Sequence, residues 1–145
     1  MRPLLIAPLV IVAALGCHDQ PLGPSTARGL TLALELAKTS LPRGDLDTIT
    51  VTLTNTNPDT VSLGAGGCPL LAYVTDPDGT TVFPSGGNWY CIAILRRLTL
   101  APGETEAAPF VLDTHALPAG VYSAYGTFSA DGIQLRTPPA MVQVN

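Results

Sequence analysis

Apolar and polar residues alternate with a period of two along most of the chain after residue 28. In the segment LTLALELA, four leucines fall on one face of an extended strand: Leu30, Leu32, Leu34 and Leu36. In TITVTLTN, three apolar residues share one face and four threonines occupy the other: Thr48, Thr50, Thr52 and Thr54. We interpret the threonine face as the solvent side of a strand rather than as a binding surface, because threonine is a good β-former.

Short strand patterns separated by turn signals continue to the end of the chain. The consecutive segments LLAYVT, DPDG and TTVF predict a β-hairpin, since a Pro and Gly turn separates two apolar runs. The run WYCIAILRRLTL is rich in β-formers and predicts one long strand that ends at the turn APGE. Further strands are predicted at FVLD, GVYSAYGTF, IQLR and AMVQVN. Seven to nine strands without a convincing helix favour an antiparallel β-sandwich, with a small barrel as the alternative.

The first residues have a different pattern. Arg2 precedes an apolar run of twelve residues, from Leu4 to Leu15, which Pro8 interrupts. A helix of this length falls well below the roughly 20 residues that a bilayer crossing needs. A basic start, a short apolar stretch and small residues before a cleavage site are typical of a secretory signal peptide. We therefore predict that residues 1–16 are removed on export.

The end of this segment, Ala14-Leu15-Gly16-Cys17, resembles the lipobox of bacterial lipoproteins. The resemblance implies that Cys17 is acylated and becomes the N-terminus of a chain anchored in the cell envelope, since two or three acyl chains hold a protein stably in a membrane. An ordinary signal peptidase could also cut after Gly16, and the chain would then be secreted in soluble form. Residues 17–28 predict a flexible tether of at most about 40 Å, and residues 29–145 predict the β-sandwich domain.

Three cysteines leave one over in an exported chain unless it has another role. With Cys17 assigned to lipid, Cys68 and Cys91 are the natural disulfide pair. Metal ligation is the alternative, but the sequence contains no Cys-x-x-Cys motif, and neither His18 nor His115 lies near these cysteines.

Charge limits the classes of partner. Removal of residues 1–16 leaves 6 basic and 11 acidic side chains, a net charge of -5. Such a chain repels nucleic acid and anionic lipid head groups, so we expect no nucleic-acid partner and membrane contact only through the lipid on Cys17.

Four stretches occur in a characteristic order: VTLTNTNPDTVSL, YVTDPDG, LTLAPGE and LPAGVY. Together they resemble the intracellular proteinase inhibitor (BsuPI-type) domain over roughly residues 30–128. The resemblance implies an immunoglobulin-like β-sandwich that binds proteins, with a serine protease as the implied partner. Within these stretches, Asn55 suits the turn after a strand, and Tyr122 is expected to bury its ring while its hydroxyl meets a backbone partner.

The sequence contains no motif that predicts catalysis or cofactor binding. Asp113 and His115 have no identifiable third partner, and no Gly-x-Ser-x-Gly elbow occurs. Asp76 and Asp78 resemble the start of a calcium loop, but its later ligands are missing, so a turn is the better interpretation. We predict that the chain is not an enzyme and that it uses no metal or cofactor.

Two classes of function remain. The first is a lipid-anchored binding module that recognises a protein through one loop: Ser85, Gly86, Gly87, Asn88, Trp89 and Tyr90. Two aromatic residues beside two glycines can present an interface anchor, although Trp89 could instead fill the core. The second is a structural spacer or a subunit of an envelope assembly without a dedicated ligand, which would make its contacts through a strand edge.

Overall fold

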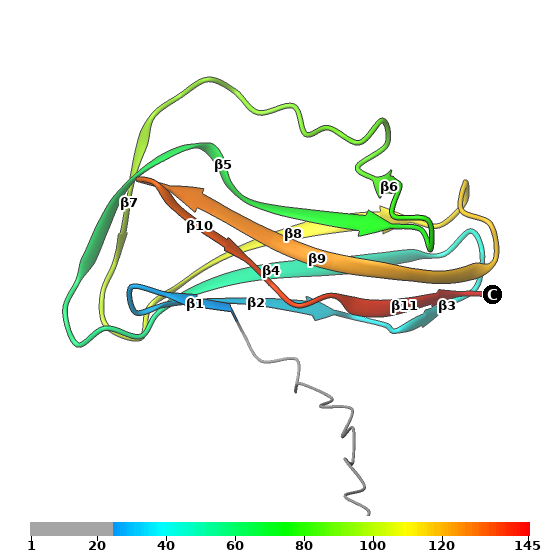
Figure 1. Cartoon of the computed structure of the whole chain (residues 1–145), viewed down its shortest axis with the longest axis horizontal. Helices are drawn as coiled ribbons and strands as arrows, with labels where there is room; N and C mark the ends of the chain where they lie inside the picture. Colours follow the sequence, from blue (N-terminus) through cyan, green and yellow to red (C-terminus); the bar gives the residue numbers. More distant parts are fainter. Residues whose placement is uncertain (1–24) are drawn as a thin grey trace, which may run out of the picture.

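The computed structural model describes residues 25–145 and shows two β-sheets packed face to face (Figure 1). Its strands are β1 (Ser25–Ala27), β2 (Leu30–Leu36), β3 (Ser40–Leu41), β4 (Leu46–Asn55), β5 (Val61–Thr75), β6 (Thr81–Phe83), β7 (Arg96–Leu100), β8 (Thr105–Asp113), β9 (Gly120–Ala130), β10 (Ile133–Arg136) and β11 (Ala140–Val144). This part of the chain contains no helix. The predicted immunoglobulin-like β-sandwich is confirmed, with 11 strands instead of seven to nine.

The two sheets differ in their strand order and in the strands that form their edges. The smaller sheet has the order β1-β2-β4-β8, so β1 and β8 are its edge strands. The larger sheet has the order β3-β11-β9-β5-β6, with β10 also paired to β9 and β7 also paired to β5. All pairs are antiparallel except that of β3 and β11. On the side where β8 faces β6, a slot remains between the two layers, and we call this side of the sandwich its open side.

The period-two pattern places the core between the sheets as predicted. Ile49, Val51 and Leu53 on β4 are fully buried, whereas the threonines between them are half-buried or exposed. Leu30 and Leu32 on β2 are also fully buried. The facing sheet contributes further buried side chains: Leu70, Ala72, Val74, Tyr122, Ala124, Phe128, Val142 and Val144. Burial of each large apolar side chain contributes about 1.5–3 kcal/mol, so this layer supplies most of the stability of the domain.

Two predicted turn residues have the expected roles. Asn55 is fully buried at the end of β4, where its side-chain amide donates hydrogen bonds to the carbonyl groups of Asp59 and Leu100, each at 2.9 Å. The hydroxyl of Tyr122 donates a hydrogen bond of 2.7 Å to the carbonyl of Pro118, and the ring is buried. Both residues therefore fix a chain reversal to the core.

The hairpin between β5 and β6 is also confirmed. Asp76 Oδ1 accepts hydrogen bonds from the backbone N–H groups of Asp78 at 3.0 Å and Thr80 at 2.8 Å. This carboxylate is therefore used by the turn itself, as its sequence pattern predicted.

Several boundaries differ from the prediction, and β5 and β8 begin earlier than the predicted segments LLAYVT and FVLD. Residues 25–27 were expected in the tether, but they form β1, which pairs with β2 through a tight turn at Arg28 and Gly29. The run expected to form one strand from Trp89 to Leu100 is a strand only from Arg96 onward. The physical reason is that Trp89 and Cys91 are each held against β5 by side-chain contacts instead of by a strand ladder.

The predicted signal peptide, Cys17 and most of the tether lie outside the described residues. Within residues 25–145, no helix has the length and hydrophobicity that a membrane crossing would need.

Candidate functional site

The loop between β6 and β7, residues 84–95, passes along the open side of the sandwich, at the top of the view in Figure 1. The side chain of Trp89 anchors this loop to the two sheets. Its indole N–H donates a hydrogen bond of 2.9 Å to the carbonyl of Ala72 on β5. Its ring packs edge-on against Phe83, with 5.4 Å between centroids, and lies 5.0 Å from Phe110 on β8. Trp89 is half-buried and contacts both sheets, so it does not stand free as an interface anchor.

A second contact that holds the loop lies two residues further on. Cys91 forms a disulfide bond with Cys68 on β5, and the Cα atoms are 5.7 Å apart, so the predicted pairing is confirmed. At Gly67 a side chain would collide with the backbone carbonyl of Ile92. The GAGG stretch thus lets the loop approach β5 at this point. Residues 25–145 contain no group of three or more side chains suited to hold a metal ion.

Between Trp89 and β7, the chain exposes a series of large apolar side chains. The exposed fractions are 98% for Tyr90, 68% for Ile92, 50% for Ile94 and 85% for Leu95. We call residues 90–95 the apolar run. Single exposed apolar residues are normal on a protein surface, but several in succession are typical of an interaction site. Of the six residues in the predicted binding loop, Tyr90 belongs to this run, whereas the side chain of Trp89 contacts both sheets of the sandwich.

Two arginines follow the apolar run on β7. Arg96 forms an ion pair of 2.8 Å with Glu106 on β8, which links the two sheets across the open side. Arg97 is exposed. Successive residues on a strand point to opposite faces, as expected from the sequence, so the two guanidinium groups do not form one patch.

A slot lies between β6 and β8, beside Trp89, with a volume of about 690 Å³. Its walls are lined by residues of β6, the loop, β8 and the turn after β8: Val82, Phe83, Pro84, Ser85, Trp89, Pro109, Phe110, Val111, Leu112, Asp113, His115, Ala116 and Leu117. Leu112 and Leu117 are buried at its base, whereas Asp113 and His115 are exposed at its mouth. We call this the β6–β8 slot. Its size lies in the range of ligand-binding clefts.

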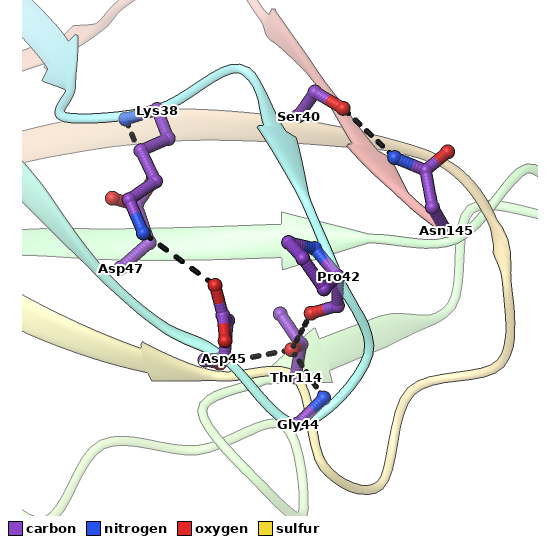
Figure 2. Close-up of polar contacts among 8 residues, drawn as sticks. All are labelled: Lys38, Ser40, Pro42, Gly44, Asp45, Asp47, Thr114 and Asn145. Carbon is purple, nitrogen blue, oxygen red and sulfur yellow. Dashed lines mark hydrogen bonds and ion pairs between the residues drawn. The ribbon is translucent and has the colours of Figure 1, made fainter.

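The end of the slot near Asp113 is fixed by a polar cluster, which Figure 2 shows. The hydroxyl of the buried Thr114 lies 2.8 Å from the carbonyl of Asp45 and accepts a hydrogen bond of 3.0 Å from the N–H of Gly44. Lys38 forms an ion pair of 3.5 Å with Asp45 in the same cluster. These contacts tie the turn after β8 to the turn between β3 and β4, so the wall of the slot is preorganised.

The Asp113 and His115 pair has a local structural role. Asp113 Oδ1 accepts a hydrogen bond of 2.8 Å from the backbone N–H of His115, not from its imidazole. This is the geometry of a turn that follows a strand. Both residues line the slot.

On the outer face of the larger sheet, Tyr73 and Tyr125 stack with 5.3 Å between ring centroids, and the guanidinium of Arg136 lies 3.6 Å from the centre of the Tyr125 ring. Burial raises the pKa of the Tyr73 hydroxyl, and the neighbouring Tyr125 raises this pKa further. The three side chains stand against one another, so they stabilise the sheet surface and leave no flat aromatic platform for a ligand.

Comparison with known proteins supports the fold and indicates no function. No family model matches the chain, and no curated protein matches it. Among solved structures, the sporulation control protein Spo0M from Bacillus subtilis is similar at 15% identity with a TM-score of 0.50, over 81% of this chain and 49% of that one. A β-glucosidase from Listeria innocua in complex with gluconolactone has 16% identity and a TM-score of 0.47, over 83% of this chain and 16% of the enzyme. The chain thus spans less than half the length of these proteins.

Proposed function

We propose that this chain is an exported, lipid-anchored binding module that recognises a protein partner through the apolar run, residues 90–95. The observation that carries the proposal is the exposure of four large apolar side chains in succession, from 50% to 98%. Exposed apolar area of this kind costs solubility, and it is typical of surfaces that a partner covers.

The attachment of the apolar run supports the same proposal. Trp89 holds one end, the Cys68–Cys91 disulfide holds the chain one residue after Tyr90, and the β7 ladder begins directly after Leu95. A segment restrained in this way loses less conformational freedom on binding than a free loop. A disulfide is also compatible with export, because oxidising compartments preserve such bonds.

Anchoring by lipid on Cys17 predicts a simple change in partitioning. The full chain should enter the detergent-rich phase of Triton X-114, and Cys17→Ser should move it to the aqueous phase, because the acyl chains supply the membrane affinity. Cys91→Ser serves as the matched control and should still enter the detergent phase. Equal partitioning of the unaltered chain and the Cys17→Ser variant would contradict the anchor and favour secretion in soluble form.

Recognition by the apolar run predicts a position-specific contact. A photo-crosslinking residue at Ile92 in the full chain should give one discrete adduct in intact cells, whereas the same residue at Met141 should give none. Met141 is a suitable control because it is 55% exposed and lies on β11 in the larger sheet. Replacing Tyr90 and Leu95 together by serine should weaken the adduct about tenfold with an unchanged melting temperature, since exposed anchors dominate binding energy but add little to the fold.

Protease inhibition is the special case that the BsuPI resemblance implies. Titration of the full chain against subtilisin-like and trypsin-like serine proteases tests it directly, because a tight inhibitor removes activity in stoichiometric amounts. Adducts of equal strength from Ile92 and Met141, together with no inhibition, would favour the alternative of a structural spacer or assembly subunit.

A further inference from the structure

The free edge of β8 offers main-chain groups for pairing. No strand within residues 25–145 pairs with this edge, and β1, where the described chain begins, lies at the opposite edge of the same sheet. In the ladder with β4, Pro109 stands opposite Thr50. Proline has no N–H, and one step beyond the end of the ladder the N–H of Thr114 donates to the carbonyl of Asp45. The even-numbered residues of β8 therefore pair with β4, and the odd-numbered residues turn their N–H and C=O groups away from it. Val111 and Asp113 therefore present their backbone groups at the free edge.

These backbone groups lie along the β6–β8 slot. The slot is lined by every residue from Pro109 to Asp113, with the side chains of Phe110 and Leu112 turned inward. A strand that paired with this edge would direct alternate side chains between the sheets, because side chains alternate across a strand. The slot would receive them against Trp89, Leu112 and Leu117.

The length of the slot is limited at both ends. On one side, the Arg96–Glu106 ion pair bridges the two sheets. On the other side, the turn at Thr114 closes it. The open part of β8 runs from Pro109 to Asp113, which corresponds to roughly 17 Å of extended strand.

Charge determines the kind of segment that fits. The exposed Asp113 lies at the mouth of the slot, and neither of the ion pairs among residues 25–145 involves it. The whole chain carries a net charge of -4. A basic side chain beside the slot would therefore meet, in a negative field, a carboxylate that forms no ion pair within residues 25–145.

We propose that the β6–β8 slot binds an extended segment of a protein partner, in which apolar residues alternate with residues that include lysine or arginine, and that this segment adds to the sandwich as a strand beside β8. The mode is strand addition: main-chain hydrogen bonds to Val111 and Asp113 give affinity, and the slot selects the alternate side chains. This site is separate from the apolar run, so it stands or fails independently of the proposed function.

The test uses the single tryptophan of the chain, because Trp89 lines the slot and its fluorescence reports directly on occupancy. The probe is a capped eight-residue peptide in which valine alternates with lysine and threonine, titrated into the purified full chain. We expect a saturable change in Trp89 emission. A peptide with glutamate in place of lysine should bind several-fold more weakly, and so should the lysine peptide to Asp113→Asn.

Strand pairing is separated from simple hydrophobic contact by two changes to the backbone. Val111→Pro removes one outward N–H inside the slot and should weaken peptide binding about tenfold. Ala107→Pro removes an N–H from the same free edge outside the slot and should leave binding unchanged; Pro109 shows that this edge accepts proline. N-methylation of the peptide amides that would face β8 should abolish binding to the unaltered chain.

Three results would overturn the proposal. The first is equal binding of the N-methylated peptide, which decides the question even where Val111→Pro does not fold. The second is uptake of the neutral probe N-phenyl-1-naphthylamine without any binding of the peptide, which would assign the slot to a small apolar ligand. The third is a chain that sediments as a dimer and dissociates on addition of the peptide, which would assign the slot to a second copy.

Discussion

Replacement of Asn55 by alanine is expected to lower the free energy of unfolding by about 3 kcal/mol. The side chain is fully buried, and its amide donates to the carbonyl groups of Asp59 and Leu100. Its Oδ1 accepts a hydrogen bond of 2.9 Å from the backbone N–H of Asn57. Alanine would remove all three hydrogen bonds, of which the bond to Leu100 is buried, and an unsatisfied buried group costs about 1–3 kcal/mol.

Urea denaturation of the full chain measures this loss. Asn57→Ala is the comparison, because Asn57 is only half-buried and its side chain donates to the accessible carbonyl groups of Arg28 and Gly29. It also donates to Asn55 Oδ1 at 3.1 Å, but its removal leaves the bonds from Asn55 to Asp59 and Leu100 in place. We expect about 1 kcal/mol for this comparison. A free energy of unfolding for Asn55→Ala within 1 kcal/mol of the unaltered chain would mean that water replaces the lost amide, and would contradict the role assigned here.

Asn55 matters for function because of where its partners lie. Leu100 is the last residue of β7, the strand that follows the apolar run directly. The backbone N–H of Asn55 also donates a hydrogen bond of 3.0 Å to the carbonyl of Glu104, in the turn before β8. Through its side chain and its backbone, this one residue therefore joins β4, β7 and the turn before β8, and the side-chain part of this link supports the presentation of the apolar run.

The sandwich could be predicted from the sequence because its strands are locally consistent. The alternation of Ile49, Val51 and Leu53 with threonine is satisfied by one arrangement only, with the apolar face inward. The roles of Asn55 and Tyr122 were also predictable, since each makes hydrogen bonds within its own turn. The Cys68–Cys91 bond followed from the number of cysteines once Cys17 was assigned to lipid.

The apolar run was not predictable, because its composition is that of a strand. Propensity favours a ladder for the segment from Trp89 to Leu95, but the indole hydrogen bond to Ala72 and the bond from Cys91 to Cys68 hold the chain against β5 in another geometry. Tertiary contacts of this kind override β-propensity. The result is exposure of residues that the pattern placed half in the core.

The β6–β8 slot could not be predicted from the sequence either. Its walls come from Phe83 and Trp89 on one side and from Phe110 and Leu112 on the other, and these become neighbours only when the two sheets pack. One local signal was available: Pro109 inside a β-pattern indicates an edge strand, because proline cannot donate to a ladder on both sides. β1 was missed because Ser25–Ala27 has no apolar periodicity and pairs through the turn at Gly29.

Replacement of Cys68 and Cys91 together by serine is expected to lower the free energy of unfolding by about 3 kcal/mol. The bond closes a loop with a sequence separation of 23 residues, and a cross-link of this span restricts the unfolded chain by roughly that amount. Both chains carry Cys17→Ser, so that no free thiol remains to exchange. Urea denaturation with and without reductant provides the measurement, and the double variant should match the reduced parent.

The same change should also loosen the apolar run locally, because the disulfide is its only covalent link to β5 within the described chain. Chymotrypsin should cut after Tyr90 or Leu95 faster in the double variant, while the ladder of β7 keeps the rest of the domain intact. Cleavage at unchanged rates, with the stability loss present, would mean that Trp89 alone fixes the loop. In that case Trp89→Phe, which keeps a ring against Phe110 but removes the hydrogen bond to Ala72, should release the apolar run.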